Sequence, residues 1–326
     1  MNNPNEAELR IGAAVDRVRT ELNQLLSRRL PVEVTTVLIP LRGKFNRARL
    51  MLAFSDLGGT IGESALKLAS GAELLHLASL IQDDLVDNSP YRQGVPALNR
   101  AVGAEAAILI SDWLFGQAYQ FFCQGKTAWL TQINQLLQAM ALSELKQELA
   151  VAKRQLPTVL SCLRYNYQKT ARFFQTCCRL GMAAGGSGNR EALIAGKVGL
   201  WWGMAYQLGN DLQDLPLMAG GGDLVDQDRR RGLLTLPLVL LLLKIPGLKR
   251  EVLSLPAASL GELLQKYGII QQCTRWYNRF LIKAEQELNR LTAATPALTW
   301  ILIREWIKKM RLVNEVFPDN AKLNLK

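Results

Sequence analysis

The chain has 326 residues, enough for one large domain or two ordinary ones with a sizeable buried core. Its 39 Lys and Arg outnumber 28 Asp and Glu, so the formal net charge is +11 and anionic partners are expected. No basic tract is interleaved with aromatic residues, which argues against nucleic acid and favours phosphate groups, and the five cysteines show neither zinc nor redox spacing. With a polar N-terminus and no secretory segment, we expect a cytoplasmic protein with reduced thiols.

Apolar residues recur at a helical period along almost the whole chain, and no stretch alternates as a β-strand. The pattern predicts helices at 5–30, 43–57, 63–87, 101–123, 127–153, 157–183 and 189–214, with shorter helices over 247–313. The most apolar run, 233–243, is expected to be a core helix, because a membrane-spanning helix needs about twenty residues. Since no linker or repeat interrupts the pattern, residues 1–326 are expected to form one all-α domain, a helical bundle with its site inside.

The predicted helix at 63–87 ends in three carboxylates, Asp83, Asp84 and Asp87. Asp83 and Asp87 lie one turn apart on the same face. Because the preceding turns are apolar, three like charges there are expected to need a neutralising cation. Oxygen ligands without Cys or a second His suit a hard ion, above all Mg²⁺. The alternative is a solvated acidic helix end, and the Arg92 turn and a second acidic cluster downstream argue against it.

The second cluster, Asn210, Asp211 and Asp214, closes the predicted helix at 189–214. Asn210 and Asp214 share a face, with Asp211 beside them. Two oxygen-rich helix ends facing each other across a bundle would hold Mg²⁺ ions that draw charge from a diphosphate leaving group. By itself, the second cluster also fits a plain helix end.

Basic groups accompany the two clusters. Lys44 and Arg47 lie one turn apart at the start of a helix, and Lys169 interrupts another among apolar and aromatic neighbours. Arg suits bidentate diphosphate contacts and Lys supplies a compact charge, although each also fits a solvated helix face. His76, the only histidine, lies about two turns before Asp83, on the face that leads to the carboxylates, and it fits either a diphosphate contact or a core histidine.

These residues fall into ordered motifs that resemble the trans-isoprenyl (polyprenyl) diphosphate synthase family. The similarity lies in Gly-Lys-x-x-Arg (43–47), Glu-Leu-Leu-His (73–76), the Asp-Asp-x-x-Asp loop through Arg92, Gly94 and Pro96, Ser-Asp-x-Leu (111–114), Glu-x-x-Gln (144–147), Lys-Thr-Ala (169–171), Tyr-Gln (206–207) and Thr-Leu-Pro (235–237). The resemblance implies an all-α isoprenoid-synthase bundle with a central apolar cavity. It also implies a dimer, either a homodimer or a heteromeric synthase.

The resemblance further implies a role for each site residue. A three-ion Mg²⁺ cluster would be held by Asp83, Asp87, Asn210, Asp211 and Asp214, with Asp84 in support. The allylic diphosphate would be held by Arg92 and Lys169, and isopentenyl diphosphate by Lys44, Arg47 and His76. The allylic cation would be stabilised by Thr170 and Gln207, and it would add to isopentenyl diphosphate without a nucleophilic side chain.

The chain departs from the family pattern at four places, three of them in the second half of the site. Gln93 stands where a second Arg is usual, and Asn210 where the family has Asp. Residues 215–227 contain no Lys, and Leu233 stands where a Lys is expected. The arginines at 229–231 are the candidates to replace the lost positive charge, but the sequence does not show where they point.

Three functions therefore stay open: chain elongation, a same-fold enzyme that passes the cation to a peptide or to an internal double bond, and a partner subunit of a heteromeric synthase. Asn210 favours the second, because class I cyclases have Asn at the related position, although Asp214 and Met218 occupy the places of their Ser and Glu. The complete first motif argues against the third. The primer, the true acceptor and a peripheral contact with membranes stay undecided.

Product length is expected to depend on the residues about one turn before Asp83. Large side chains there block the growing chain in this family, and this sequence has the small residues Ala78 and Ser79. The resemblance therefore implies a medium- or long-chain product. Aromatic residues at 113–122 are candidates for a deeper floor, and they fit ordinary core positions as well.

Overall fold

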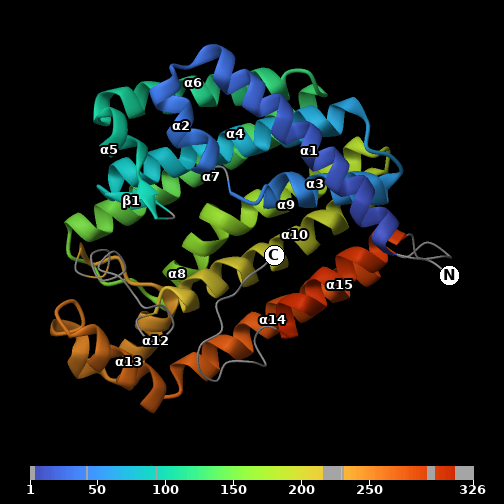
Figure 1. The fold of residues 1–326 in the computed structure, drawn as a ribbon. Coiled ribbons are helices and arrows are strands. Elements are labelled where there is room, and N and C mark those ends of the chain that lie inside the picture. Colours follow the sequence, from blue (N-terminus) through green and yellow to red (C-terminus); the bar gives the residue numbers. More distant parts are fainter. Residues whose placement is uncertain are drawn as a thin grey trace. The chain divides into compact units, whose positions relative to one another are not determined.

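A computed structural model of the chain describes residues 4–41, 43–92, 94–215, 229, 231–291 and 298–312. The predicted all-α fold is confirmed, because helices form nearly all of the described part (Figure 1). The chain divides into two compact units. The first unit comprises Met1–Asn134, Thr176–Gly196 and Leu291–Ile303, and the second comprises Gln135–Gln175, Lys197–Arg290 and Arg304–Lys326. The prediction of one domain over 1–326 stays a prediction.

Helices α1 to α6 lie in the first unit. Their bounds are α1 (Pro4–Arg29), α2 (Val32–Leu41), α3 (Asn46–Gly58), α4 (Glu63–Val86), α5 (Leu98–Val102) and α6 (Ala104–Phe122). The sequence pattern missed α2 and α5, and it placed α1, α3, α4 and α6 within a few residues. Helix α4 packs against α1, α3 and α6, and most of its side chains are buried. An apolar circumference of this kind is typical of a core helix.

Close packing of α4 on α6 depends on Gly71. A Cβ atom at this position would lie 2.5 Å from the Phe122 ring, so only glycine allows the two helices to approach this closely. The hydroxyl of Ser111 in α6 donates to the carbonyl oxygen of Ala78 in α4 at 3.3 Å. The acidic end of α4 is therefore fixed to a rigid helix pair.

A short hairpin follows α4. Strands β1 (Tyr91–Arg92) and β2 (Val95–Pro96) pair antiparallel, with Arg92 opposite Val95. Asn88 has φ 51° and Gly94 has φ 82°, so the chain turns sharply at both positions. The turn at Asn88 carries Arg92 back toward the end of α4, and the turn at Gly94 leads from β1 into β2. The sequence pattern predicted only a loop here.

The second unit contains α8 (Val159–Asn166), the π-helical turn η1 (Tyr167–Ala171), α12 (Leu236–Lys244), the 3₁₀ turn η2 (Pro246–Arg250), α13 (Ala257–Lys266) and α14 (Ile269–Asn289). Four helices have residues in both units: α7 (Thr127–Ala152), α9 (Arg172–Ala184), α10 (Asn189–Gln213) and α15 (Leu298–Leu312). The helix predicted at 157–183 is thus interrupted by a π-turn, where Lys169 had marked an irregularity. Among the described residues, no helix is both long and apolar enough to cross a membrane.

Candidate active site

The first acidic motif is held together by an internal ion pair. Arg92 donates three hydrogen bonds to Asp84, from Nε to both carboxylate oxygens at 2.8 Å and from Nη2 to Oδ1 at 2.6 Å. Asp84 is only 2% exposed, so its charge is compensated within the protein. Burial opposes the charge on Arg92, but these hydrogen bonds and the charges of Asp83 and Asp87 raise its pKa. The structure thus gives Asp84 and Arg92 a structural partnership that the sequence did not indicate.

Asp83 and Asp87 are the half-buried members of this motif. The backbone N–H of Asp87 donates to the carbonyl oxygen of Asp83 at 2.8 Å, so the two residues lie one turn apart on α4. Within the described ranges, no three Asp, Glu, His or Cys side chains gather closely enough to hold a metal ion on their own. Two carboxylates with oxygen-only chemistry still fit Mg²⁺, which commonly binds one or two carboxylates and takes its other ligands from water and phosphate oxygens.

His76 lies on α4, where the positive charges of two arginines act on its imidazole. Desolvation, with the positive charges of Arg47 and Arg92, holds the pKa of His76 well below its ordinary value of 6.5. At neutral pH the imidazole is therefore uncharged, and it would contact a phosphate as a neutral N–H donor. The structure brings His76, Arg47 and Arg92 into one electrostatic neighbourhood, while Lys44 is exposed.

Glu73 fixes the segment that carries Lys44 and Arg47. This glutamate is 3% exposed, and its Oε1 accepts a hydrogen bond from the backbone N–H of Ala48 at 2.7 Å, in the first turn of α3. A carboxylate there satisfies a backbone donor that has no partner within the helix and stabilises the positive end of the helix dipole. The sequence motif named Glu73 without a role, and a buried acid in an apolar helix was the available signal.

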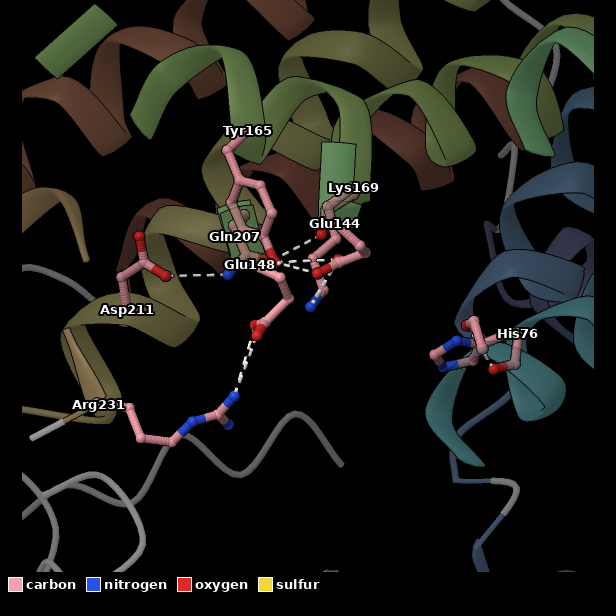
Figure 2. A network of polar contacts seen from close by, with 10 residues as sticks. His76, Glu144, Glu148, Tyr165, Lys169, Gln207, Asp211 and Arg231 are labelled. Carbon is pink, nitrogen blue, oxygen red and sulfur yellow. Dashed lines mark hydrogen bonds and ion pairs between the residues drawn. The ribbon is translucent and has the colours of Figure 1, made fainter. Parts of the chain in front are cut away.

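The second unit contains a chain of side-chain hydrogen bonds (Figure 2). The Thr170 hydroxyl donates to Oε1 of Gln207 at 2.7 Å, and Nε2 of Gln207 donates to Oδ1 of Asp211 at 2.9 Å. Asn166 donates to the other oxygen of Asp211 at 3.2 Å. Desolvation raises the pKa of Asp211 to about 6, although both amides counteract this shift. Three predicted site residues therefore form one network, with Asn166 as an additional member.

The π-turn η1 determines the position of Thr170 in this network. One extra residue in a helical turn shifts the side chains that follow, and such turns are frequent at functional sites. Helix α10 approaches η1 at Gly203, where a Cβ atom would lie 2.5 Å from Cα of Ala171. The Gly-Met-Ala-Tyr-Gln run at 203–207 therefore brings Gln207 within reach of Thr170.

Lys169, the neighbour of Thr170 in the same turn, pairs with Glu144 of α7. Its Nζ lies 2.9 Å from Oε1 of Glu144 and 5.4 Å from the centroid of the Tyr165 ring. The Tyr165 hydroxyl donates to the Glu144 carboxylate, 3.0 Å from each oxygen. Figure 2 shows Lys169, Glu144 and Tyr165 pointing toward one another. Glu144 is therefore a shared acceptor for both residues.

The remaining predicted metal ligands lie at the end of α10. The backbone N–H of Asp214 donates to the carbonyl oxygen of Asn210 at 3.0 Å, so these two residues are also one turn apart. Asn210 is half-buried and Asp214 is exposed. Gln93, Met218, Arg230 and the loop residues 216–228 lie outside the described residues. That the two acidic helix ends face each other across a cavity stays a prediction.

Comparison with known proteins identifies the family. The polyprenyl synthetase family model matches residues 30–255. The octaprenyl diphosphate synthase of Escherichia coli is 29% identical over 201 residues, which are 60% of this chain and 61% of that protein. The geranylfarnesyl diphosphate synthase of Aeropyrum pernix is 30% identical over 68% of this chain and 72% of its own length. The chain spans less than two thirds of the octaprenyl relatives that it matches.

Solved structures support the same fold. A heptaprenyl diphosphate synthase from Staphylococcus aureus has a TM-score of 0.82 at 21% identity, covering 93% of this chain and 98% of that one. A polyprenyl synthase from Caulobacter crescentus, complexed with calcium and isoprenyl diphosphate, has a TM-score of 0.81 at 22% identity, covering 95% and 96%. The resemblance inferred from the motifs is thus confirmed, and the chain belongs to the polyprenyl synthetase family.

Proposed function

We propose that the chain is a Mg²⁺-dependent prenyltransferase that extends an allylic diphosphate with isopentenyl diphosphate to a medium- or long-chain trans-polyprenyl diphosphate. The observation that carries the proposal is the hydrogen-bonded chain of Thr170, Gln207 and Asp211, with Lys169 as the neighbour of Thr170. It combines a diphosphate-binding cation with oriented dipoles in one place. The octaprenyl and geranylfarnesyl relatives support elongation as the reaction.

Asp83 and Asp87 in the first unit, and Asn210, Asp211 and Asp214 in the second, would be the ligands of Mg²⁺, which would supply positive charge to neutralise the developing charge of the diphosphate leaving group. In the first unit, the Asp84–Arg92 pair holds the end of α4 and its hairpin in place, so that Asp83 and Asp87 keep their one-turn spacing. Asn210 brings an oxygen without a charge, so the second set of ligands carries one negative charge fewer than the usual family pattern.

In the second unit, the chain's own groups bind and orient the allylic substrate. Lys169 binds the diphosphate, and the Gln207 amide, fixed between Thr170 and Asp211, presents its dipole to the allylic carbons. A fixed dipole stabilises developing charge without reorganising during the reaction. In the first unit, Arg47, Lys44 and the neutral His76 bind isopentenyl diphosphate.

The test incubates the purified full chain with Mg²⁺, labelled isopentenyl diphosphate and allylic primers of increasing length, and then separates the products. Elongated diphosphates are expected, and chelation of Mg²⁺ should stop their formation. Free alcohols or hydrocarbons would instead identify an enzyme that passes the cation to water or to an internal double bond, and elongation would be excluded.

A second candidate is a subunit of a two-component synthase. The heptaprenyl diphosphate synthase component 2 of Bacillus subtilis is 25% identical over 91% of this chain and 88% of its own length. We propose this assembly as the alternative to a homodimer. Sedimentation of the purified chain, and turnover that requires a second polypeptide, would distinguish the two.

A further inference from the structure

Two carboxylates on one face of α7 each hold a cation from a different segment of the second unit. Glu144 pairs with Lys169 of η1 at 2.9 Å, and Glu148 pairs with Arg231, whose Nη2 lies 3.3 and 3.5 Å from its two oxygens. Glu144 and Glu148 are four residues apart, so their side chains are neighbours on the helix surface. Figure 2 shows both glutamates with their cations. Two positive charges are thus brought to one face of α7.

The segment that carries Arg231 is anchored by Arg229. The buried guanidinium of Arg229 donates to the carbonyl oxygens of Val252 and of Leu255, the latter at 2.7 Å. Gly232, with φ 98°, then turns the chain away after Arg231. Of the three arginines that the sequence offered as replacements for a missing lysine, Arg229 is thus committed to backbone carbonyls, and Arg231 reaches the carboxylate face of α7.

The pair formed by Arg231 and Glu148 is much looser than the pair formed by Arg92 and Asp84. Arg92 donates to the buried Asp84 carboxylate at 2.6 and 2.8 Å. Arg231 lies 3.3 Å from the Glu148 carboxylate, and 27% of the Arg231 side chain and 34% of the Glu148 side chain are exposed. Ion pairs of the second kind contribute little to stability. A diphosphate has more charge and more acceptor oxygens than a carboxylate, so it is a stronger partner than Glu148 for the Arg231 guanidinium.

Glu144 differs from Glu148 because it has a second partner. The Tyr165 hydroxyl holds its carboxylate independently of Lys169. Glu144 therefore keeps its position through Tyr165 when Lys169 binds a ligand, and in the absence of a ligand it fixes the position of the Lys169 ammonium. Glu148 gives Arg231 the equivalent resting position one turn along α7.

We propose that Arg231 is a second diphosphate-binding cation beside Lys169, and that Glu148 is the positioning residue that holds Arg231 before the diphosphate binds. This inference rests on the proposed function, because the ligand class, a prenyl or inorganic diphosphate, is taken from it. The net charge of the four side chains is zero in the resting state. When a diphosphate binds, Lys169 and Arg231 exchange their carboxylates for its oxygens.

The test measures binding of inorganic diphosphate, in the presence of Mg²⁺, to the full chain by calorimetry. Arg231→Gln should weaken binding by about tenfold to a hundredfold, the usual range for a charged hydrogen bond, and Arg231→Lys should retain part of it. The control is Arg304→Gln, which removes an arginine from another carboxylate pair of this unit, with Glu285 at 2.9 Å, and should leave binding unchanged. In steady-state kinetics, Arg231→Gln should raise the KM of the allylic primer more than that of isopentenyl diphosphate.

Glu148 is tested by a double-mutant cycle with the same binding measurement. Glu148→Gln removes the competing carboxylate, so diphosphate should bind about threefold tighter, as expected when a weak surface ion pair no longer has to be exchanged. In the Arg231→Gln background the same change should have no further effect. Equal effects of Glu148→Gln in both backgrounds would show that Glu148 does not act through Arg231.

The outcomes separate this inference from the proposed function. If Lys169→Gln weakens diphosphate binding but the diphosphate Kd of Arg231→Gln stays within twofold of that of the unmodified chain, the role of Arg231 is overturned and the proposed function stands. If the unmodified chain does not bind diphosphate with Mg²⁺, both are overturned. The melting temperatures of all variants are measured alongside. If Arg231→Gln loses both folding and diphosphate binding while Arg231→Lys keeps both, Arg231 has a structural role instead.

Discussion

Arg92 donates three hydrogen bonds to Asp84, and this pair neutralises the central carboxylate of the first acidic motif from within the protein. The three aspartates therefore have two kinds of role. Asp84 is buried and paired, whereas Asp83 and Asp87 are half-buried and keep the one-turn spacing suited to a metal ion.

The first prediction is that Asp84 and Asp83 contribute differently to the free energy of unfolding. Removing one partner of a buried ion pair leaves the other charge uncompensated, so Asp84→Ala should lower the free energy of unfolding by about 3 kcal/mol. Asp83→Ala removes a repulsive charge and should leave stability unchanged or slightly raised. Urea unfolding of the two variants checks this, and equal losses would contradict the division of roles.

The second prediction concerns activity. Asp83→Ala should reduce prenyl transfer by more than tenfold, which corresponds to at least about 1.4 kcal/mol of barrier, because it removes a proposed Mg²⁺ ligand. The matched control is Gln82→Ala, an exposed neighbour on the same helix turn, which should keep its rate. Retention of more than about a tenth of the activity by Asp83→Ala would exclude it as an essential ligand.

The third prediction concerns the pH dependence of stability. The pKa of His76 is lowered in the folded state, so the unfolded chain binds a proton first as the pH falls through about 6.5. The contribution of His76 to the free energy of unfolding is therefore favourable above that pH, and it declines below that pH by at most about 1.4 kcal/mol per pH unit. His76→Gln should unfold with a shallower decline between pH 7.5 and 5.5 than the unmodified chain. An identical decline would mean that His76 titrates normally.

The same histidine tests the isopentenyl site. If His76 contacts isopentenyl diphosphate, His76→Gln should raise the KM of that substrate with less effect on the allylic KM. A neutral hydrogen bond contributes about 0.5–1.5 kcal/mol, a change of roughly two- to tenfold. A large loss of melting temperature with unchanged KM would identify a core histidine instead.

The fourth prediction concerns Gln207. Replacing it with Leu removes the acceptor of Thr170 and one of the two donors to the buried Asp211. A buried polar group left without a partner costs about 1–3 kcal/mol. Gln207→Leu should therefore lower the free energy of unfolding by at least about 1 kcal/mol. The control is Gln286→Leu, an exposed glutamine on α14. Similar small effects of both changes would show that the network contributes nothing.

The fifth prediction concerns product length. Ala78 is fully buried where α4 packs on α6, so Ala78→Phe should overpack this contact and lower stability by about 1–3 kcal/mol. Ser79 is half-buried, so Ser79→Phe is the change better suited to test a block to the growing chain. Shorter products with an unchanged first condensation are expected from Ser79→Phe. An unaltered product distribution would place the growing chain elsewhere.

The sequence by itself determined the helical class and most helix positions, because apolar periodicity is a local property that each segment carries alone. The predicted helices at 63–87 and 189–214 correspond to α4 and α10, and their acidic ends fall where the pattern placed them. The pattern missed α2, α5 and the hairpin after α4, which are short and carry little periodicity. It marked Lys169 as an interruption without indicating the π-turn around it.

Only the tertiary structure decided which side chains are partners. Arg92 contacts Asp84 because the sharp turn at Asn88 brings β1 back to α4, and Arg231 contacts Glu148 across 83 residues of sequence. Likewise, Glu73 could be assigned to the start of α3 only once α3 and α4 were packed together. Ion pairs and hydrogen bonds act over a few ångströms in space. The residue types that make them can be recognised in a sequence, but their pairing depends on how the helices pack.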